Sequence, residues 1–284
     1  DDFDDCINNS TIGNISFNDG VYFLKTKEFK PYPVEEIYST IKLDIDYPLQ
    51  TEETDVDGKF IIDRFEDGFF EENKYLVGLK LKATARMIGG HFRDKFWLNG
   101  VSYGRNSCKG VETTVQQKAF GKYYNPIANS FFLVKPTGDE VKDNSTLIPM
   151  RFCRILTTQE PTNGKKTDGA LIKSYASGGD PKTARYFYSD VAIAFVPHFI
   201  INLYCNKGLT MDNSDAYDNC FYVYYDICYE DNVIDTKRQK PKITFEGKDI
   251  KDLLLEDKYI RAYWRLIIDS YEDKPFSIDK RIKE

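Results

Sequence analysis

The chain has 284 residues, with 39 Lys and Arg against 45 Asp and Glu, so its formal net charge is −6 at pH 7. This balance excludes a uniformly basic nucleic-acid-binding protein, and any nucleic-acid contact must come from a local basic patch. A hydrophobic fraction of 41%, with 20 Tyr and 20 Phe, excludes a disordered chain and indicates a substantial core. The first residue is Asp1 rather than Met, so we expect a fragment of a longer protein.

The histidines and cysteines restrict the chemistry further. His91 and His198 are too few for a His-rich zinc site and leave little scope for His-based catalysis. None of the six cysteines forms a CxxC pair, and Cys153 and Cys205 lie in apolar runs, which is typical of buried free thiols. We therefore expect a reduced, intracellular protein. We expect no membrane partner, because no apolar run approaches the roughly 18 residues of a membrane span.

Residues 1–92 are expected to form an N-terminal adaptor of a hairpin and helices. An Asn-Asp-Gly turn signal at 18–20 lies between two apolar stretches and predicts a hairpin over 15–24. The spacing of apolar residues predicts mostly helix over 66–92, ended by two glycines.

Residues 93–231 alternate strand and helix signals, which predicts an α/β core with a central, mostly parallel sheet. The expected helices cover 113–120 and 169–175, and the expected strands cover 95–98, 150–156, 195–205 and 217–229.

Residues 232–284 are expected to form an exposed loop and a C-terminal helical tail. The loop covers 232–248 and contains a basic run, and 249–271 has the spacing of an amphipathic helix. The apolar face of that helix would consist of Ile250, Leu253, Leu254, Tyr259, Tyr263 and Ile267.

Residues 100–110 follow a predicted strand and precede a predicted helix, where an α/β nucleotide-binding domain places its phosphate loop. Such a loop needs small residues, a Lys for the phosphates and a Ser or Thr hydroxyl for Mg²⁺. The pattern GxxxxGK[ST] is not satisfied in either of two registers. In one, Ser107, Cys108 and Lys109 replace Gly, Lys and Ser/Thr. In the other, Lys109 is the phosphate lysine, while Cys108 replaces Gly and Gly110 replaces the hydroxyl. The nucleotide-binding candidates are Gly100, Gly104, Arg105, Asn106, Ser107 and Lys109, and a Gly-rich surface turn is the alternative.

The segment after the predicted strand at 150–156 carries one acid, Glu160, next to Gln159. An acid at such a strand end holds Mg²⁺ and the hydrolytic water in nucleotide-hydrolysing domains. Glu160 is therefore the candidate metal ligand, and an ordinary solvated glutamate is the alternative.

Residues 171–188, followed by an apolar strand that ends at Asn206, resemble the ATPase core of the superfamily 3 helicases. The most similar branch is the poxvirus-type primase-helicase family of large DNA viruses, phages and mobile elements. That family carries the motif K-x-x-(T/S)-G-G-D-x-x-x-A-R-x-x-Y. Residues 17–22 also resemble its entry hairpin, and 120–124 resemble the G-x-Y after its phosphate-loop helix. The residues that match this motif are Ser177, Gly178, Gly179, Asp180, Ala184, Arg185 and Tyr188, and Lys173 corresponds to its lysine with one additional residue between them.

The resemblance covers most of 15–275 and implies an AAA+-like P-loop domain that assembles as a hexameric homo-oligomer. It implies Mg-ATP between neighbouring subunits, single-stranded DNA in the central pore, and a viral replication site in the host cytoplasm or nucleus. Asn206 would orient the attacking water, and Glu160 would be the general base or metal holder. The residues implied to contact DNA phosphates are Lys173, Lys182 and Arg185.

The sequence departs from this family at the arginine finger as well as at the phosphate loop. The family motif D-x-A-x-x-R-R resembles the stretch from Asp215; aligned on Ala216, it has Asn219 and Cys220 in place of the two arginines. An arginine finger is worth about 10³–10⁵ in rate in related machines. We therefore expect a helicase-like domain of a viral or mobile-element DNA replication protein with weak or lost hydrolysis. The alternatives are a working motor, a catalytically dead scaffold or virion component, and a regulatory nucleic-acid-binding subunit.

Overall fold

A five-stranded sheet forms the centre of the molecule, in a computed structural model that describes residues 10–35, 37–134, 144–159, 165–186, 191–206, 208–242, 244–245 and 247–278. The strand order is β10-β4-β9-β6-β5, and every neighbouring pair is parallel. This confirms the predicted α/β fold with a parallel sheet. The strands are β4 (Trp97–Ser102), β5 (Tyr124–Pro126), β6 (Ile155–Gln159), β9 (Ile200–Cys205) and β10 (Cys220–Tyr225).

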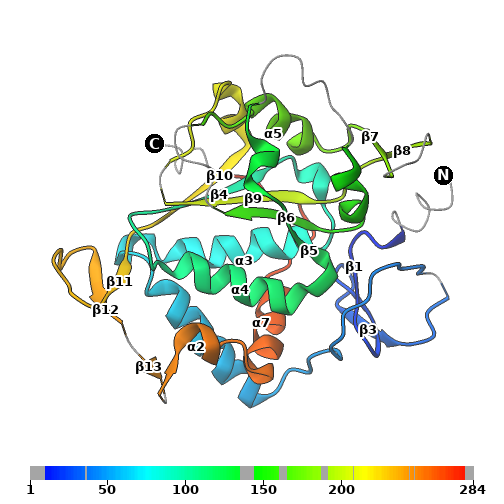
Figure 1. The fold of residues 1–284 in the computed structure, drawn as a ribbon. Coiled ribbons are helices and arrows are strands. Elements are labelled where there is room, and N and C mark those ends of the chain that lie inside the picture. The colour runs from blue at the N-terminus through cyan, green and yellow to red at the C-terminus, as the bar shows by residue number, and fades with distance from the viewer. Residues whose placement is uncertain are drawn as a thin grey trace.

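Helices cover both faces of the sheet, which is why β4 and β9 are buried along their whole length. Figure 1 shows α3 and α4 on one side of the sheet and α5 on the other. The helices are α2 (Glu52–Glu66), α3 (Tyr75–Ile88), α4 (Cys108–Phe120), α5 (Gly169–Ala176), α6 (Ile250–Leu253) and α7 (Asp257–Asp269).

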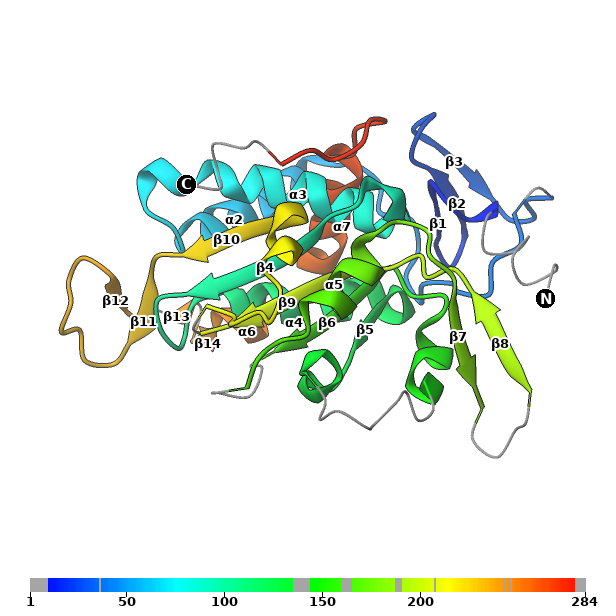
Figure 2. The same ribbon diagram turned by 90° about the horizontal axis from the view of Figure 1, so that it is seen from above.

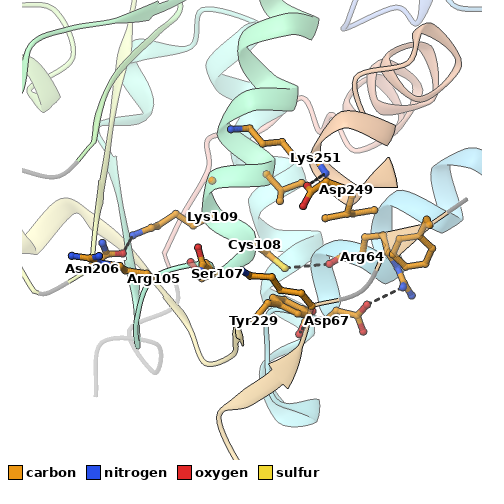
Figure 3. A pocket seen from close by; sticks show the side chains of 16 residues that line it. Arg64, Asp67, Arg105, Ser107, Cys108, Lys109, Asn206, Tyr229, Asp249 and Lys251 are labelled. Carbon is orange, nitrogen blue, oxygen red and sulfur yellow. Dashed lines mark hydrogen bonds and ion pairs between the residues drawn. The ribbon is translucent and has the colours of Figure 1, made fainter. Parts of the chain in front are cut away.

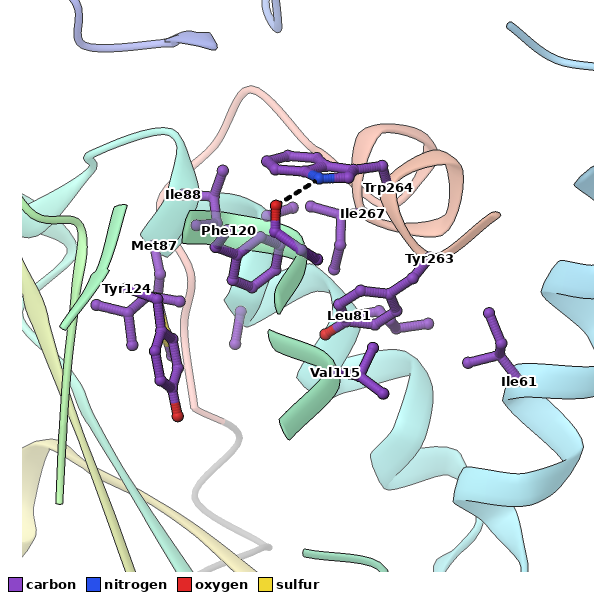
Figure 4. Packing of buried hydrophobic residues seen from close by; sticks show 14 of the residues in the cluster. Ile61, Leu81, Met87, Ile88, Val115, Phe120, Tyr124, Tyr263, Trp264 and Ile267 are labelled. Atoms are coloured by element: carbon purple, nitrogen blue, oxygen red, sulfur yellow. Dashed lines mark hydrogen bonds between the residues drawn. The ribbon is translucent and has the colours of Figure 1, made fainter. Parts of the chain in front are cut away.

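The C-terminal helix α7 packs into the same core as α2, α3 and α4. Trp264 is fully buried there, and its Nε1 donates a hydrogen bond to the Ala119 carbonyl at 2.9 Å, next to the ring of Phe120 (Figure 4). The predicted amphipathic face is confirmed: Tyr263 and Ile267 are also buried, as the 3–4-residue spacing requires.

Two of the smaller sheets lie next to each other, and Figure 2 shows both on one side of the molecule. The predicted N-terminal hairpin is present as β1 (Asn14–Ser16) and β2 (Gly20–Phe23), extended by β3 (Glu28–Pro31). A second, antiparallel hairpin pairs β7 (Lys182–Arg185) with β8 (Ala192–Phe195).

Several predicted boundaries are wrong, because buried apolar residues also line turns. The run at 150–156 begins as the end of a 3-10 helix, Asn144–Met150, and β6 starts only at Ile155. The apolar run 195–205 is divided between the end of β8 and the whole of β9.

The loop expected at 232–248 instead contains short strands. These are β12 (Gln239–Pro241), which pairs with β11 (Cys228–Glu230), and the hairpin of β13 (Thr244–Phe245) with β14 (Lys248–Asp249). The expected division at 92/93 and 231/232 stays a prediction.

The cysteines of the described residues are buried thiols, as expected for Cys153 and Cys205. Cys108, Cys153, Cys205, Cys220 and Cys228 are free and buried, and Cys6 lies outside the described residues. Within the described part of the chain, no helix is both long enough and apolar enough to cross a membrane.

Candidate functional site

The loop between β4 and α4 lies at the carboxyl edge of the sheet, where parallel strands present their binding residues. Asn106 has a positive φ of 54°, and Ser107 is the extended residue that precedes the first turn of α4. The free N–H groups of this 13-residue helix therefore face the end of the loop, where they favour an anion.

Lys109 and Asn206 meet at this edge. Lys109 is the second residue of α4, is only 8% exposed, and its Nζ donates to Asn206 Oδ1 at 2.5 Å. Asn206 follows β9, the strand next to β4, and its Oδ1 also accepts from the Ser102 hydroxyl at 3.0 Å. The sequence allowed two alignments of the phosphate-loop pattern. In the alignment that makes Lys109 the phosphate lysine, the lysine side chain lies at the carboxyl edge of the sheet, as a phosphate loop requires.

A cavity of about 390 Å³ extends from this pair along the start of α4 (Figure 3). Its wall carries five cationic side chains and two carboxylates, so it favours a polyanion. The cations are Arg64, Arg105, Lys109, Lys242 and Lys251, and the acids are Asp67 and Asp249.

Ser107 supplies a second indication that the start of α4 suits an anion. Its side chain is 7% exposed and lines the cavity, and its hydroxyl has no hydrogen-bond partner among the described residues. A buried hydroxyl without a partner is costly, and an oxygen-rich ligand at the helix start would satisfy it.

Cys108 occupies the place where a phosphate loop has glycine. Its Sγ donates to the Arg64 carbonyl at 3.4 Å, and burial raises the pKa of the thiol to about 12. The side chain packs the start of α4 against α2, close to Gly68, where an added Cβ would lie 3.0 Å from the sulfur. Cys108 therefore anchors the helix and carries no charge at neutral pH.

The two candidate glycines lie apart from the cavity wall. Gly100 is inside β4, where an added Cβ would fall 2.4 Å from the Tyr204 ring, so its small size permits packing within the core. The Gly104 carbonyl lies 2.7 Å from the Ser102 hydroxyl, which shares its one proton between this carbonyl and Asn206 Oδ1. Arg105 and Asn106 are exposed and line the cavity.

Glu160, the candidate metal ligand, lies outside the described residues. Gln159 is the last residue of β6 and pairs with Tyr204 of β9, so the end of β6 is beside the strand that leads to Asn206. No group of three or more His, Cys, Asp or Glu able to hold a metal occurs among the residues that the structure describes.

The candidate DNA-binding residues lie on α5 and the β7–β8 hairpin. Figures 1 and 2 both place this hairpin on the opposite side of the molecule from β13, which borders the cavity. Lys173 forms an ion pair with Asp215 at 3.5 Å, and Lys182 Nζ donates to the Ser174 hydroxyl at 2.9 Å. Arg185 is exposed at the end of β7.

The two residues in place of the arginine finger differ in environment. Asn219 is exposed at the end of a 3-10 helix, Ser214–Asn219. Cys220 is 4% exposed and begins β10, where it pairs with Trp97. No cationic side chain therefore stands at these two positions.

Half of the cavity wall was not found from the sequence. It comes from α2, β11 and the C-terminal segment, which are far from the phosphate loop along the chain and carry no motif. These additional residues are Arg64, Asp67, Tyr229, Lys242, Phe245, Asp249, Ile250 and Lys251.

Comparisons with known proteins agree with a helicase-like fold. No family model matches the sequence. The chain is 22% identical over 271 residues to putative helicase V13 of the Sputnik virophage, covering 93% of this chain and 33% of that protein. It thus spans about a third of its relative's length.

Solved structures with the same fold include the A form apo structure of the NrS-1 C-terminal region. The TM-score is 0.50 at 13% identity, covering 82% of this chain and 51% of that one. The chain therefore has a helicase-like α/β fold and is related in sequence to a viral protein named as a helicase.

Proposed function

We propose that this chain binds a nucleoside triphosphate, ATP with Mg²⁺, in the cavity between the start of α4 and the end of β9. The observation that carries the proposal is the contact of Lys109 with Asn206 across two adjacent parallel strands. A cation at a helix start and a polar amide at the next strand end are what a γ-phosphate and its attacking water require. The unpartnered Ser107 hydroxyl and the exposed Arg105 support a phosphate position between them.

The wider role that we propose is a superfamily 3-like motor domain of a viral or mobile-element DNA replication protein. The similarity to the virophage protein and the strand order of the sheet support this role. By family resemblance, the chain would assemble as a hexameric ring around single-stranded DNA. In that ring, Lys173, Lys182 and Arg185 would contact DNA phosphates.

Hydrolysis is proposed to be weak or lost. Gly110 offers no hydroxyl for Mg²⁺, and Asn219 and Cys220 supply no positive charge at the finger positions. Glu160 is the acid expected to hold Mg²⁺ or act as general base. The same substitutions favour a second candidate role, in which the domain is a catalytically dead scaffold, virion component or regulatory nucleic-acid-binding subunit.

Calorimetric titration of the protein with ATP, with and without Mg²⁺, tests nucleotide binding. We expect saturable binding that Lys109→Ala weakens at least about tenfold, since one phosphate contact by a buried cation is lost. Lys122→Ala, which changes an exposed lysine outside the cavity, is the matched control and should bind normally. Absence of binding to the unaltered protein would contradict the proposal and favour the scaffold.

A steady-state ATPase assay on the oligomer tests the proposed loss of hydrolysis. We expect turnover far below about one per second, the lower end of ordinary enzyme rates. Turnover at that rate, abolished by Lys109→Ala, would contradict weak hydrolysis and favour a working motor.

A further inference from the structure

One end of the cavity is unsuited to phosphate. Figure 3 shows Lys109 and Asn206 at one end of the lining side chains and Arg64 at the other, with Ser107 and Cys108 between them. The cavity wall also includes apolar side chains of Val111 on α4, Phe245 on β13 and Ile250 on α6, three separate elements, and of these Phe245 lies against Arg64. Apolar and aromatic surface of this kind does not stabilise an anion.

Arg64 presents a flat surface at this end. Its guanidinium lies over the Phe60 ring at 5.4 Å and over the Phe245 ring at 5.0 Å. An ion pair with Asp67 at 3.2 Å fixes the guanidinium from the same helical turn. The Nε of Arg64 is buried and has no hydrogen-bond partner among the described residues. A planar cation and an aromatic ring held in this way are the surfaces on which nucleobases stack.

We infer that this end of the cavity binds the base of the nucleotide, with Phe245 and Arg64 as the residues that contact it. The inference rests on the proposed function, because it takes the phosphates to lie at Lys109 and Ser107. It adds which residues hold the base, and so why a nucleoside triphosphate would bind better than inorganic polyphosphate. It also assigns residues of β13, β14 and α6 to the wall beside the base, within the same chain.

The volume of the cavity agrees with a ligand that has both a phosphate part and a base. A cavity of about 390 Å³ lies in the range that holds a whole small ligand, roughly 300–1,000 Å³, and exceeds what a triphosphate alone needs. The carboxylates of Asp67 and Asp249 lie on the wall as well, where they disfavour further phosphate and accept hydrogen bonds from amino groups of a base.

Calorimetry with two probes, ATP and inorganic tripolyphosphate, separates the two ends. Phe245→Ala should weaken ATP binding roughly tenfold, as expected for loss of one stacked base, and should leave tripolyphosphate binding unchanged. Lys109→Ala should weaken both. Phe245→Trp should retain ATP binding, because it keeps a flat ring, and Tyr38→Ala, at a side chain 63% exposed and outside the cavity, should change neither.

Three results would count against the inference. Equal affinity of the unaltered protein for ATP and tripolyphosphate would show that no base is bound, while leaving phosphate binding intact. If Phe245→Ala weakens the binding of ATP and of tripolyphosphate equally, Phe245 supports the structure of the site and does not contact a base. If neither probe binds the unaltered protein, the proposed function itself fails, and this inference fails with it.

Discussion

Lys109 Nζ donates a hydrogen bond to Asn206 Oδ1, although 97 residues separate the two in the sequence. Lys109 is placed by the start of α4 after β4, and Asn206 is placed by the end of the neighbouring strand β9. The Ser102 hydroxyl donates to the same oxygen, so the amide is oriented before any ligand arrives. The pair therefore forms a preorganised polar contact at the edge of the sheet.

Replacing Asn206 by Asp tests whether this contact lies beside phosphate. The carboxylate would hold Lys109 as an ion pair and would repel a phosphate, so Asn206→Asp should weaken ATP binding at least about tenfold. Asn213→Asp is the matched control, since it makes the same chemical change at a 3-10 helix cap that either residue satisfies. Unchanged ATP affinity in Asn206→Asp would place the phosphates elsewhere.

A buried ion pair that joins α3 to α4 should make a large contribution to the free energy of unfolding. Lys80 and Glu112 form this pair with both side chains 4% exposed, and the Tyr225 hydroxyl donates to Glu112 Oε2 at 2.8 Å. Lys80→Met leaves the carboxylate buried without its cation, so it should lower the free energy of unfolding by about 3–5 kcal/mol. The double variant Lys80→Met/Glu112→Leu should recover most of that loss in urea denaturation. A double variant as unstable as the single one would contradict this account.

His198 should make stability depend on pH in the acidic range. It stacks on Phe92 with ring centroids 4.6 Å apart, and burial, together with the charge of Arg154, lowers the pKa of His198 to about 3. Below about pH 6.5 the unfolded chain binds a proton there that the native protein does not, so stability falls as the pH decreases.

The comparison with His198→Phe, which keeps the stacking and cannot titrate, isolates this effect. Between pH 6.5 and 4.5, the unaltered protein should lose about 2 kcal/mol more of its unfolding free energy than the variant loses. Identical pH profiles in thermal or urea denaturation would show that His198 titrates normally in the folded protein.

If the chain binds single-stranded DNA, as we propose, the β7–β8 hairpin should contribute to the salt dependence of that binding. Arg185→Ala should weaken binding and lower the slope of log K against log salt by about 0.7, the value for one phosphate on a single strand. Arg261→Ala, at an exposed position on α7, serves as the control. Fluorescence anisotropy at several salt concentrations measures both quantities, and an unchanged slope in Arg185→Ala would remove this arginine from the interface.

The fold was largely predictable, because its signals are local. The Asn-Asp-Gly turn, the apolar runs and the 3–4-residue spacing of Tyr263 and Ile267 each fix one element. Boundaries failed where apolar side chains enter the core from turns, as Met150 and Cys153 do ahead of β6. An apolar run by itself does not distinguish such a turn from a strand.

The candidate site was predictable only at the end where Lys109 and Asn206 meet. Lys109 and Asn206 follow strands and carry the right side chains, so their meeting follows from a parallel sheet. Phe245 gave no such signal. The sequence predicts an exposed loop for the segment that contains it. Phe245 lines the cavity because β13 pairs with β14 next to α6. The periodicity of apolar residues and the spacing of motifs are local features, so they do not predict which distant segments pack together.

An experimental structure of the protein with a non-hydrolysable ATP analogue tests the central claim most directly. The account predicts triphosphate density between the first turn of α4 and Asn206, with Lys109 Nζ and the Ser107 hydroxyl within hydrogen-bond distance of phosphate oxygens. A structure obtained at saturating analogue with this cavity empty, or with the nucleotide bound elsewhere, would contradict it.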